Sequence, residues 1–255
     1  MVMHPLISSL FAATLQFAVG SLLATVVSDA GGKVTPGFLR LAGVTALSGA
    51  LLAWLLVGNG GPGEATAALA LVLLTAAYTV FQFTGRRTVR LALGWLGLLV
   101  GGVAIVLAAG ARPSPSLGPL WTMLASAASA MALGTSMMAM ILGHWYLVTP
   151  RLSATPLRIL CDLVVVSLVT LAGFALWYVL ERPAATNFGL DNAVFRWSGF
   201  VAVTVVPIGI TIAARICCQE WPRGRAIQAA TGLLYITAAM VLAGALAGNM
   251  VLLTG

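Results

Sequence analysis

Long apolar stretches fill almost the whole chain, and the charged residues lie in the short gaps between them. Only 7% of the 255 residues are charged, whereas a water-soluble domain carries about a quarter. A backbone surrounded by hydrocarbon must satisfy its hydrogen bonds within its own segment, so each stretch that crosses a bilayer must be a helix. The sequence therefore predicts an all-α integral membrane protein. One crossing takes about 20 residues, so no room remains for a soluble catalytic domain, and we do not expect a stand-alone enzyme.

Eight of these stretches are long enough to cross a membrane, and turn-forming Gly and Pro residues separate them. We expect the helices at residues 5–28, 38–58, 65–84, 91–110, 118–148, 157–180, 195–216 and 226–252. Pro207 and Gly209 lie inside the seventh stretch, where a proline interrupts the helical hydrogen bonding and predicts a kink.

The basic residues are distributed unevenly between the two sides that these helices would connect. Ten of the 13 Lys and Arg residues flank the first, third, fifth and seventh connections: Lys33, Arg40, Arg86, Arg87, Arg90, Arg151, Arg158, Arg215, Arg223 and Arg225. Only Arg112, Arg182 and Arg196 lie near the other connections. Because positively charged loops stay in the cytoplasm, we expect both termini outside. The composition, rich in Ala and Arg and poor in Lys, is typical of bacteria and predicts the bacterial inner membrane.

The two halves of the chain resemble each other at corresponding places. The matching segments are residues 17–21 with 131–135, 35–41 with 155–160, and 90–99 with 225–234. Three matches in the same order favour an internal duplication of four helices. Since four is an even number, both copies would have the same orientation and be related by an axis along the membrane normal. We expect two four-helix bundles, formed by residues 1–112 and 113–255.

Two pairs of glycines at a spacing of four residues are candidates for close helix packing. They are Gly97 with Gly101 in the fourth stretch and Gly244 with Gly248 in the eighth. Small residues at this spacing let two membrane helices approach closely. The alternative is that glycine is simply common in membrane helices.

The densest group of polar and aromatic residues surrounds the turn near residue 150. The candidate residues are His144, Trp145, Tyr146, Arg151, Arg158 and Asp162. His144 precedes Pro150 by six residues and Asp162 follows Pro156 by six, so both would lie at similar depth on facing helices. One interpretation is a cytoplasmic-side pocket that handles a proton or binds a quinone. The other is a structural corner in which the aromatic rings anchor the interface and Arg158 pairs with Asp162 one turn away.

Haem and metal cofactors are not expected. A haem with two histidine ligands needs both histidines at the same depth in the membrane. His4 is expected at the outer end of the first helix and His144 at the inner end of the fifth, on opposite sides of the membrane. The cysteines Cys161, Cys217 and Cys218 form no CxxC or CxxCH motif, which excludes covalent haem c and a zinc ribbon. The basic residues flank membrane spans, so we expect no nucleic-acid partner.

The leading functional hypothesis is an integral subunit of a larger electron-transfer complex, which anchors other subunits and binds a quinone near the 144–162 corner. The expected architecture resembles the eight-helix, haem-free quinol-interacting subunits of polysulfide-reductase type at the level of the fold, which implies such a role. A small-solute transporter or channel is the alternative, with Gln16, Gln82 and Asn249 lining a path between the repeats. A structural or assembly protein without a ligand is the third hypothesis.

We predict that reporter tags will find the arginine-bearing connections in the cytoplasm. Tags inserted near residues 34, 86 and 224 should be protected from an external protease or label, because positive charge near a span opposes translocation. A tag near residue 60 should be accessible and serves as the control. Exposure of the arginine-bearing connections on the outside would contradict the predicted orientation.

Overall fold

A computed structural model describes residues 5–58, 60–112, 118–149, 152–181, 193–219 and 225–254, and all the regular elements in these ranges are helical. The elements are α1 (Pro5–Gly31), α2 (Pro36–Leu56), α3 (Pro62–Phe81), α4 (Arg87–Ala111), α5 (Gly118–Val148), α6 (Thr155–Glu181), α7 (Ala193–Phe200), the π-helical segment η1 (Val201–Val205), α8 (Val206–Cys217) and α9 (Arg225–Thr254). In the described ranges, eight spans are long and apolar enough to cross a membrane. The predicted fold class is therefore confirmed.

Several helices begin before the positions predicted from the sequence, and prolines start two of them. The first residue of α2 is Pro36 and that of α3 is Pro62. Proline is favoured at the first helical position, where its missing N–H would have no helical partner anyway. Thr35 caps α2, since its side-chain oxygen accepts a 3.4 Å hydrogen bond from the backbone N–H of Phe38. Gly32 ends the preceding helix with a φ of 66°, a conformation that favours glycine.

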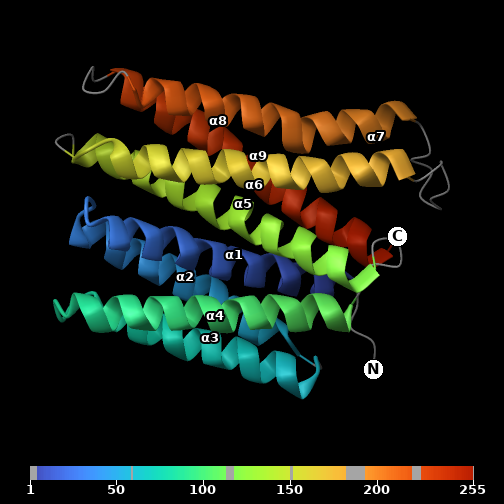
Figure 1. Ribbon diagram of the computed structural model, residues 1–255, viewed down its shortest axis with the longest axis horizontal. Helices are drawn as coiled ribbons and strands as arrows, with labels where there is room; N and C mark the ends of the chain where they lie inside the picture. The colour runs from blue at the N-terminus through green and yellow to red at the C-terminus, as the bar shows by residue number, and fades with distance from the viewer. Residues whose placement is uncertain are drawn as a thin grey trace.

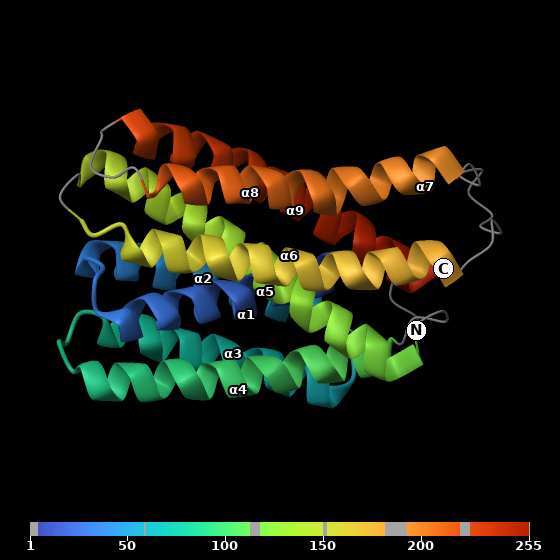
Figure 2. The same cartoon turned by 45° about the horizontal axis from the view of Figure 1, so that its top comes forward.

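The helices form two rings of four. In the first ring, α1 and α3 each contact both α2 and α4. In the second, α5 and α8 each contact both α6 and α9. Figures 1 and 2 show the two rings side by side, with α1 to α4 (blue to green) mainly below α5 to α9 (light green to red). The main contact between the rings is made by α1 and α5.

A pair of glycines brings α1 and α5 into backbone contact. A Cβ atom placed on Gly20 would lie 1.8 Å from the carbonyl oxygen of Ala130, and one on Gly134 would lie 1.9 Å from the carbonyl carbon of Gly20. No side chain fits into either position without moving a helix. In a bilayer, where lipid is as apolar as the helices, such close packing is a main source of helix association.

Two further contacts between the rings agree with the predicted duplication. The helix α1 also contacts α9, and α5 also contacts α4. In the predicted duplication α1 corresponds to α5 and α4 corresponds to α9, so these two contacts are equivalent. Gly20 and Gly134 hold the same position in the matching segments 17–21 and 131–135. The duplication and the bundle boundary after residue 112 stay predictions, and residues 113–117 lie outside the described residues.

The other glycines singled out by the sequence differ in their surroundings. A Cβ on Gly97 would lie 3.0 Å from a methyl carbon of Leu22, and one on Gly101 would lie 2.8 Å from a methyl carbon of Val19, so both face α1. A Cβ on Gly244 would lie 3.1 Å from the Cβ of Val203 in η1. The position of a Cβ on Gly248, in contrast, borders open space.

The irregularity predicted at Pro207 is a π-helical segment. The helices α7 and α8 are joined by η1 into one span, which Figure 2 shows as a continuous line. Proline has no N–H to donate to the carbonyl of the residue four positions earlier, which is Val203. The backbone instead closes a wider turn, in which the N–H of Val206 donates to the carbonyl oxygen of Val201. Segments of this kind occur frequently at functional sites.

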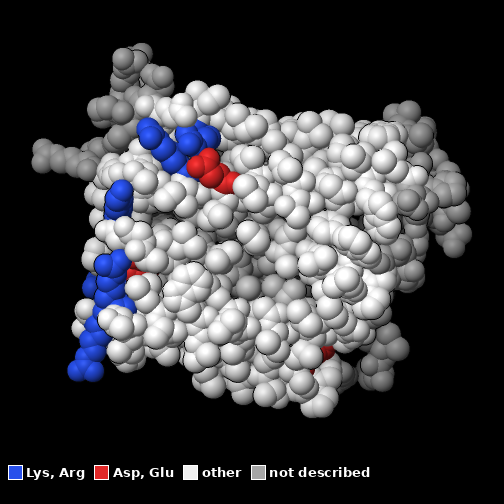
Figure 3. Space-filling model, viewed as in Figure 1, with Lys and Arg blue, Asp and Glu red and all other residues white. Residues whose placement is uncertain are grey.

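Positive charge gathers at one end of the molecule. Figure 3 shows that Lys and Arg side chains on the visible face cluster at the end where α1 meets α2 and α3 meets α4. We call this end the arginine-rich end. The chain begins α1 and ends α9 at the other end, here called the opposite end. Which end faces the cytoplasm stays a prediction.

We predict that Gly134→Ala destabilises the protein by about 3 kcal/mol or more, because overpacking of a tight contact costs about 1–3 kcal/mol even where side chains can yield. Here a backbone carbonyl would have to move. Thermal unfolding of the purified protein in detergent measures the effect. Gly102→Ala is the matched control, since a Cβ there meets nothing within 4 Å, and its unfolding temperature should not fall. Equal unfolding temperatures for both variants would contradict the prediction.

Candidate functional site

His144, the centre of the candidate corner, lies on the exposed surface of α5. Its Nδ1 atom is 3.4 Å from the hydroxyl of Tyr235 on α9. The two rings meet edge to face, with centroids 6.4 Å apart. The imidazole therefore joins α5 to α9 rather than to α6, where the sequence placed its partner.

The carboxylate of Asp162 pairs with an arginine that the sequence did not select. It accepts a 2.8 Å bond from Nε of Arg215 on α8, and 56% of its side chain is exposed. Arg158 instead donates from Nε and Nη2 to the carbonyl oxygen of Cys218, at 3.2 and 3.0 Å. The predicted bridge between Arg158 and Asp162 is thus replaced, in the described part of the chain, by two contacts to the end of α8.

The aromatic residues of the corner are packed into the protein. Tyr146 is fully buried and donates from its hydroxyl to the carbonyl oxygen of Ser153 in the following turn. The Trp145 ring lies over Gly37 of α2, where a Cβ would be 2.8 Å from the ring. Arg151 lies outside the described residues. The described side chains of this corner point to different neighbours, and its interpretation as a quinone or proton site stays a prediction.

A second polar group lies between the two rings of helices. The side-chain amides of Gln16 on α1 and Asn249 on α9 form a reciprocal pair: the nitrogen of each donates to the oxygen of the other, at 3.1 and 3.0 Å. The hydroxyl of Ser129 on α5 donates to the Gln16 oxygen at 3.0 Å. Gln16 is 2% exposed and Asn249 is 5% exposed. Three helices from both rings therefore meet at one buried polar point.

Two cavities adjoin this amide pair. The larger, of about 140 Å³, lies between α1, α5, α6, η1 and α9. The smaller, of about 40 Å³, lies between α1, α4, α5 and α9. Gln16, Ser126 and Asn249 line both cavities. We call the two cavities and their shared wall the crevice. An apolar cavity of about 150 Å³ accommodates a molecule the size of benzene, so the larger cavity has room for a small solute.

The walls of the larger cavity combine a few polar groups with apolar side chains. Besides the amide pair, its polar lining consists of Ser126, Ser129 and Thr204, and the last residue belongs to η1. None of the described residues that line it has a charged side chain. Gly244 and Gly248 of α9 form part of the wall, and the absence of side chains there leaves room for the cavity.

A buried ion pair closes the smaller cavity near the opposite end. Arg112, which follows α4 and lines this cavity, donates from both terminal nitrogens to the two carboxylate oxygens of Glu64, each at 2.8 Å. Glu64 is 5% exposed. The guanidinium also lies over the ring of Phe11, 5.3 Å from its centroid. This two-pronged pairing neutralises the arginine, so the cavity carries no net charge from it.

A second buried ion pair ties the first ring together at the arginine-rich end. Asp29 of α1 accepts bonds from Nε and Nη2 of Arg90 on α4, at 2.7 and 2.5 Å, and a 3.2 Å bond from the hydroxyl of Tyr78 on α3. Arg87 donates to the carbonyl oxygen of Ala30 at 2.9 Å, at the last turn of α1. The arrangement is a structural clamp between three helices.

Sequence reasoning placed the amides on a hypothetical path but did not join them, and it missed both ion pairs. Arg112 was counted only among the basic residues near the connections, and Glu64 was not singled out. Glu64 lies in the first turn of α3 and Arg112 directly follows α4, so both lie at the same end of two consecutive helices. That placement was the available signal, because neighbouring antiparallel helices bring such ends together. Gln82 is buried at the end of α3, but it does not line either cavity.

Comparison with known proteins finds no family model, no curated protein and no solved structure that matches this chain. Within the described residues, no group of three or more His, Cys, Asp or Glu side chains is arranged to hold a metal ion. The function must therefore be argued from the geometry of the crevice.

We predict that Glu64→Ala lowers the free energy of unfolding by about 3–5 kcal/mol, because it removes one charge of a buried, two-pronged ion pair. Asp162→Ala is the matched control, since its carboxylate also pairs with an arginine at 2.8 Å but is 56% exposed. Exposed pairs contribute about 0–1 kcal/mol. Thermal or denaturant unfolding in detergent measures both, and equal losses would show that burial does not decide the energy of these pairs.

Proposed function

We propose that this protein binds a small uncharged polar solute in the crevice between its two rings of helices and moves it across the membrane. The observation that carries the proposal is the hydrogen-bonded pair of Gln16 and Asn249 on the shared wall of two cavities. Polar side chains inside a membrane span are costly, and they mark substrate paths more often than other positions do.

The hydrogen-bonding capacity of the pair indicates what it would recognise. Each amide nitrogen carries two hydrogens, and one of them is used in the reciprocal pair. The Gln16 oxygen already accepts two bonds, from Asn249 and Ser129. With respect to the described part of the chain, one N–H donor on each amide is left over. Such a site suits a hydroxyl or carbonyl oxygen.

The surroundings favour a solute without charge. The lining of the larger cavity has no ionised side chain, and Arg112 beside the smaller one is neutralised by Glu64. An ion transferred into such a site would lose its hydration without gaining a partner, at a large cost in free energy. A neutral solute loses only a few hydrogen bonds, which the free amide hydrogens can replace.

Movement across the membrane is supported by the position and construction of the crevice. Transporters built from repeats place their substrate site at the repeat interface, and they use interrupted helices there. The predicted duplication would put the crevice at such an interface. The η1 segment, which interrupts the α7–α8 span, contributes Val203 and Thr204 to the larger cavity.

We predict that proteoliposomes containing the protein admit glycerol, urea or acetamide faster than protein-free liposomes do, measured by stopped-flow light scattering. Gln16→Leu should slow this flux about tenfold, because it removes a free donor and leaves Asn249 without its buried partner. Gln82→Leu is the matched control: it removes a buried amide that does not line the crevice. Equal loss in both variants would contradict an amide site in the crevice.

A second pair of variants blocks the cavity without removing a polar group. Gly248→Val should place methyl groups in the larger cavity, while Gly232→Val on the same helix introduces the same residue outside it. A Cβ at either position meets nothing within 4 Å. Flux should fall in the first variant and persist in the second. If wild-type protein admits none of the three solutes above background, the transport proposal fails.

The hypothesis of an electron-transfer complex subunit stays a prediction. Its test is co-purification: a stable association with redox subunits from native membranes would support it. If His144→Ala and Asp162→Asn leave the quinone-dependent activity of that assembly unchanged, the quinone site at the 144–162 corner is excluded.

A further inference from the structure

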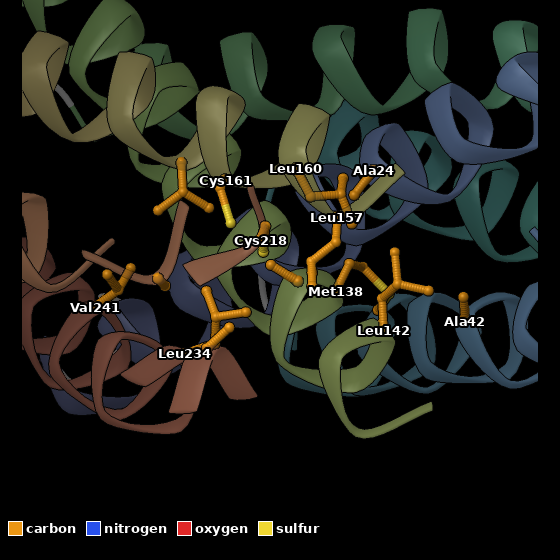
Figure 4. Close-up of a cluster of buried hydrophobic side chains, with 14 of the residues drawn as sticks. Ala24, Ala42, Met138, Leu142, Leu157, Leu160, Cys161, Cys218, Leu234 and Val241 are labelled. Atoms are coloured by element: carbon orange, nitrogen blue, oxygen red, sulfur yellow. The ribbon is translucent and has the colours of Figure 1, made fainter. Parts of the chain in front are cut away.

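Two cysteines from different helices meet in the core of the second ring. Cys161 lies on α6, and Cys218 is the residue that directly follows α8. Both are free cysteines with no exposed surface, and their thiols interact with each other. Figure 4 shows the sulfur of Cys161 directed toward Cys218, among the apolar side chains of α5, α6 and α9.

Polar contacts on both sides of the two thiols hold α6 against the end of α8. On one side, the guanidinium of Arg158 donates two hydrogen bonds, of 3.2 and 3.0 Å, to the carbonyl oxygen of Cys218. On the other side, Arg215 pairs with Asp162 at 2.8 Å. These contacts resist sliding of the two helices, so the sulfurs stay together without a covalent bond.

The charges around the pair favour a reactive thiolate at Cys218. A hydrogen bond from the Cys161 thiol, together with the positive charges of Arg158 and Arg215, lowers the pKa of Cys218. The thiolate is the form of cysteine that attacks oxidants, and a nearby arginine is a known cause of its formation. Cys217, the neighbour of Cys218, is partly exposed and lies outside this pair.

We propose that Cys161 and Cys218 form an oxidisable dithiol site, which a peroxide converts into a disulfide between α6 and the end of α8. The Cys218 thiolate attacks one oxygen of hydrogen peroxide, the O–O bond breaks, and a sulfenic acid and hydroxide form. The sulfur of Cys161 then attacks the sulfenic sulfur, which forms the S–S bond and releases water. The two thiols lose two electrons, and the peroxide gains them.

The dithiol proposal does not depend on the proposed solute path, although one helical span contributes to both sites. Cys218 follows the end of the span that contains η1, and η1 contributes to the larger cavity. A disulfide between Cys218 and α6 would restrain the α7–α8 span covalently. In the reduced protein, the contacts of Arg158 and Arg215 hold this span against α6. Failure of solute flux would leave the dithiol proposal standing, and the reverse also holds.

Counting thiols before and after oxidation tests the proposal on the full-length protein in native membranes. The variants are Cys161→Ser, Cys218→Ser and the matched control Cys217→Ser. Each sample is treated with hydrogen peroxide, quenched with catalase, denatured in SDS and labelled with a polyethylene-glycol maleimide, which retards the protein on a gel once per free thiol. A parallel sample is reduced with dithiothreitol before labelling.

Wild-type protein should fall from three labels to one, and Cys217→Ser from two to none, with full recovery after reduction. Cys218→Ser should keep both labels, because it lacks the attacking thiolate. Cys161→Ser should lose at least the label of Cys218, which becomes a sulfenic acid without its native partner thiol, and should recover it after reduction. Three labels on oxidised wild-type protein would overturn the proposal. Loss of two labels from wild-type protein but of none from Cys217→Ser would also overturn it, because it would show that the disulfide involves Cys217. Because Cys217→Ser retains the native pair, it keeps the test valid if the other variants fail to fold.

Discussion

The contact between Gly20 and Gly134 determines how the two rings of helices meet. Backbone touches backbone at this point, so α1 and α5 cross more closely than helices with side chains could. The crevice lies beside this crossing, and residues of α1, α5 and α9 line its larger cavity. Lipid offers no hydrophobic force that would press two apolar helices together. Close packing and a few hydrogen bonds must therefore supply the association.

Polar side chains buried in the spans all need hydrogen-bond or ion-pair partners, but the ion pairs and the amide pair meet this need differently. Burial in an apolar medium demands that each be paired. The pairs Asp29–Arg90 and Glu64–Arg112 meet this demand completely and clamp helix ends. The amides of Gln16 and Asn249 pair with each other and also line a cavity, and their bonds to described residues use one of the two hydrogens of each amide. Complete pairing is typical of a structural role, and partial pairing next to a space is what a binding site requires.

The candidate sites show that a sequence suggests contacts between residues close together in the chain, but not between residues far apart in it. His144 and Asp162 drew attention because they flank one turn, where closeness along the chain made them easy to pair. In the fold, each turns to a helix that comes later in the chain, His144 to α9 and Asp162 to α8. Gln16 and Asn249 were recognised individually as membrane amides, but they stand at nearly opposite ends of the chain. No local pattern connects positions so far apart.

The class of the fold, the number of spans and the separation of basic residues to one end could all be inferred from the amino-acid sequence. Each of these follows from local chemistry: an apolar stretch of sufficient length must be helical in lipid, and arginine beside it must remain in a polar layer. The folded arrangement was needed to learn which faces of the helices meet, which carboxylate pairs with which arginine, and where space remains between the rings. These outcomes depend on the fit of side chains between helices remote in the chain, and periodicity within one apolar helix carries little information about that fit.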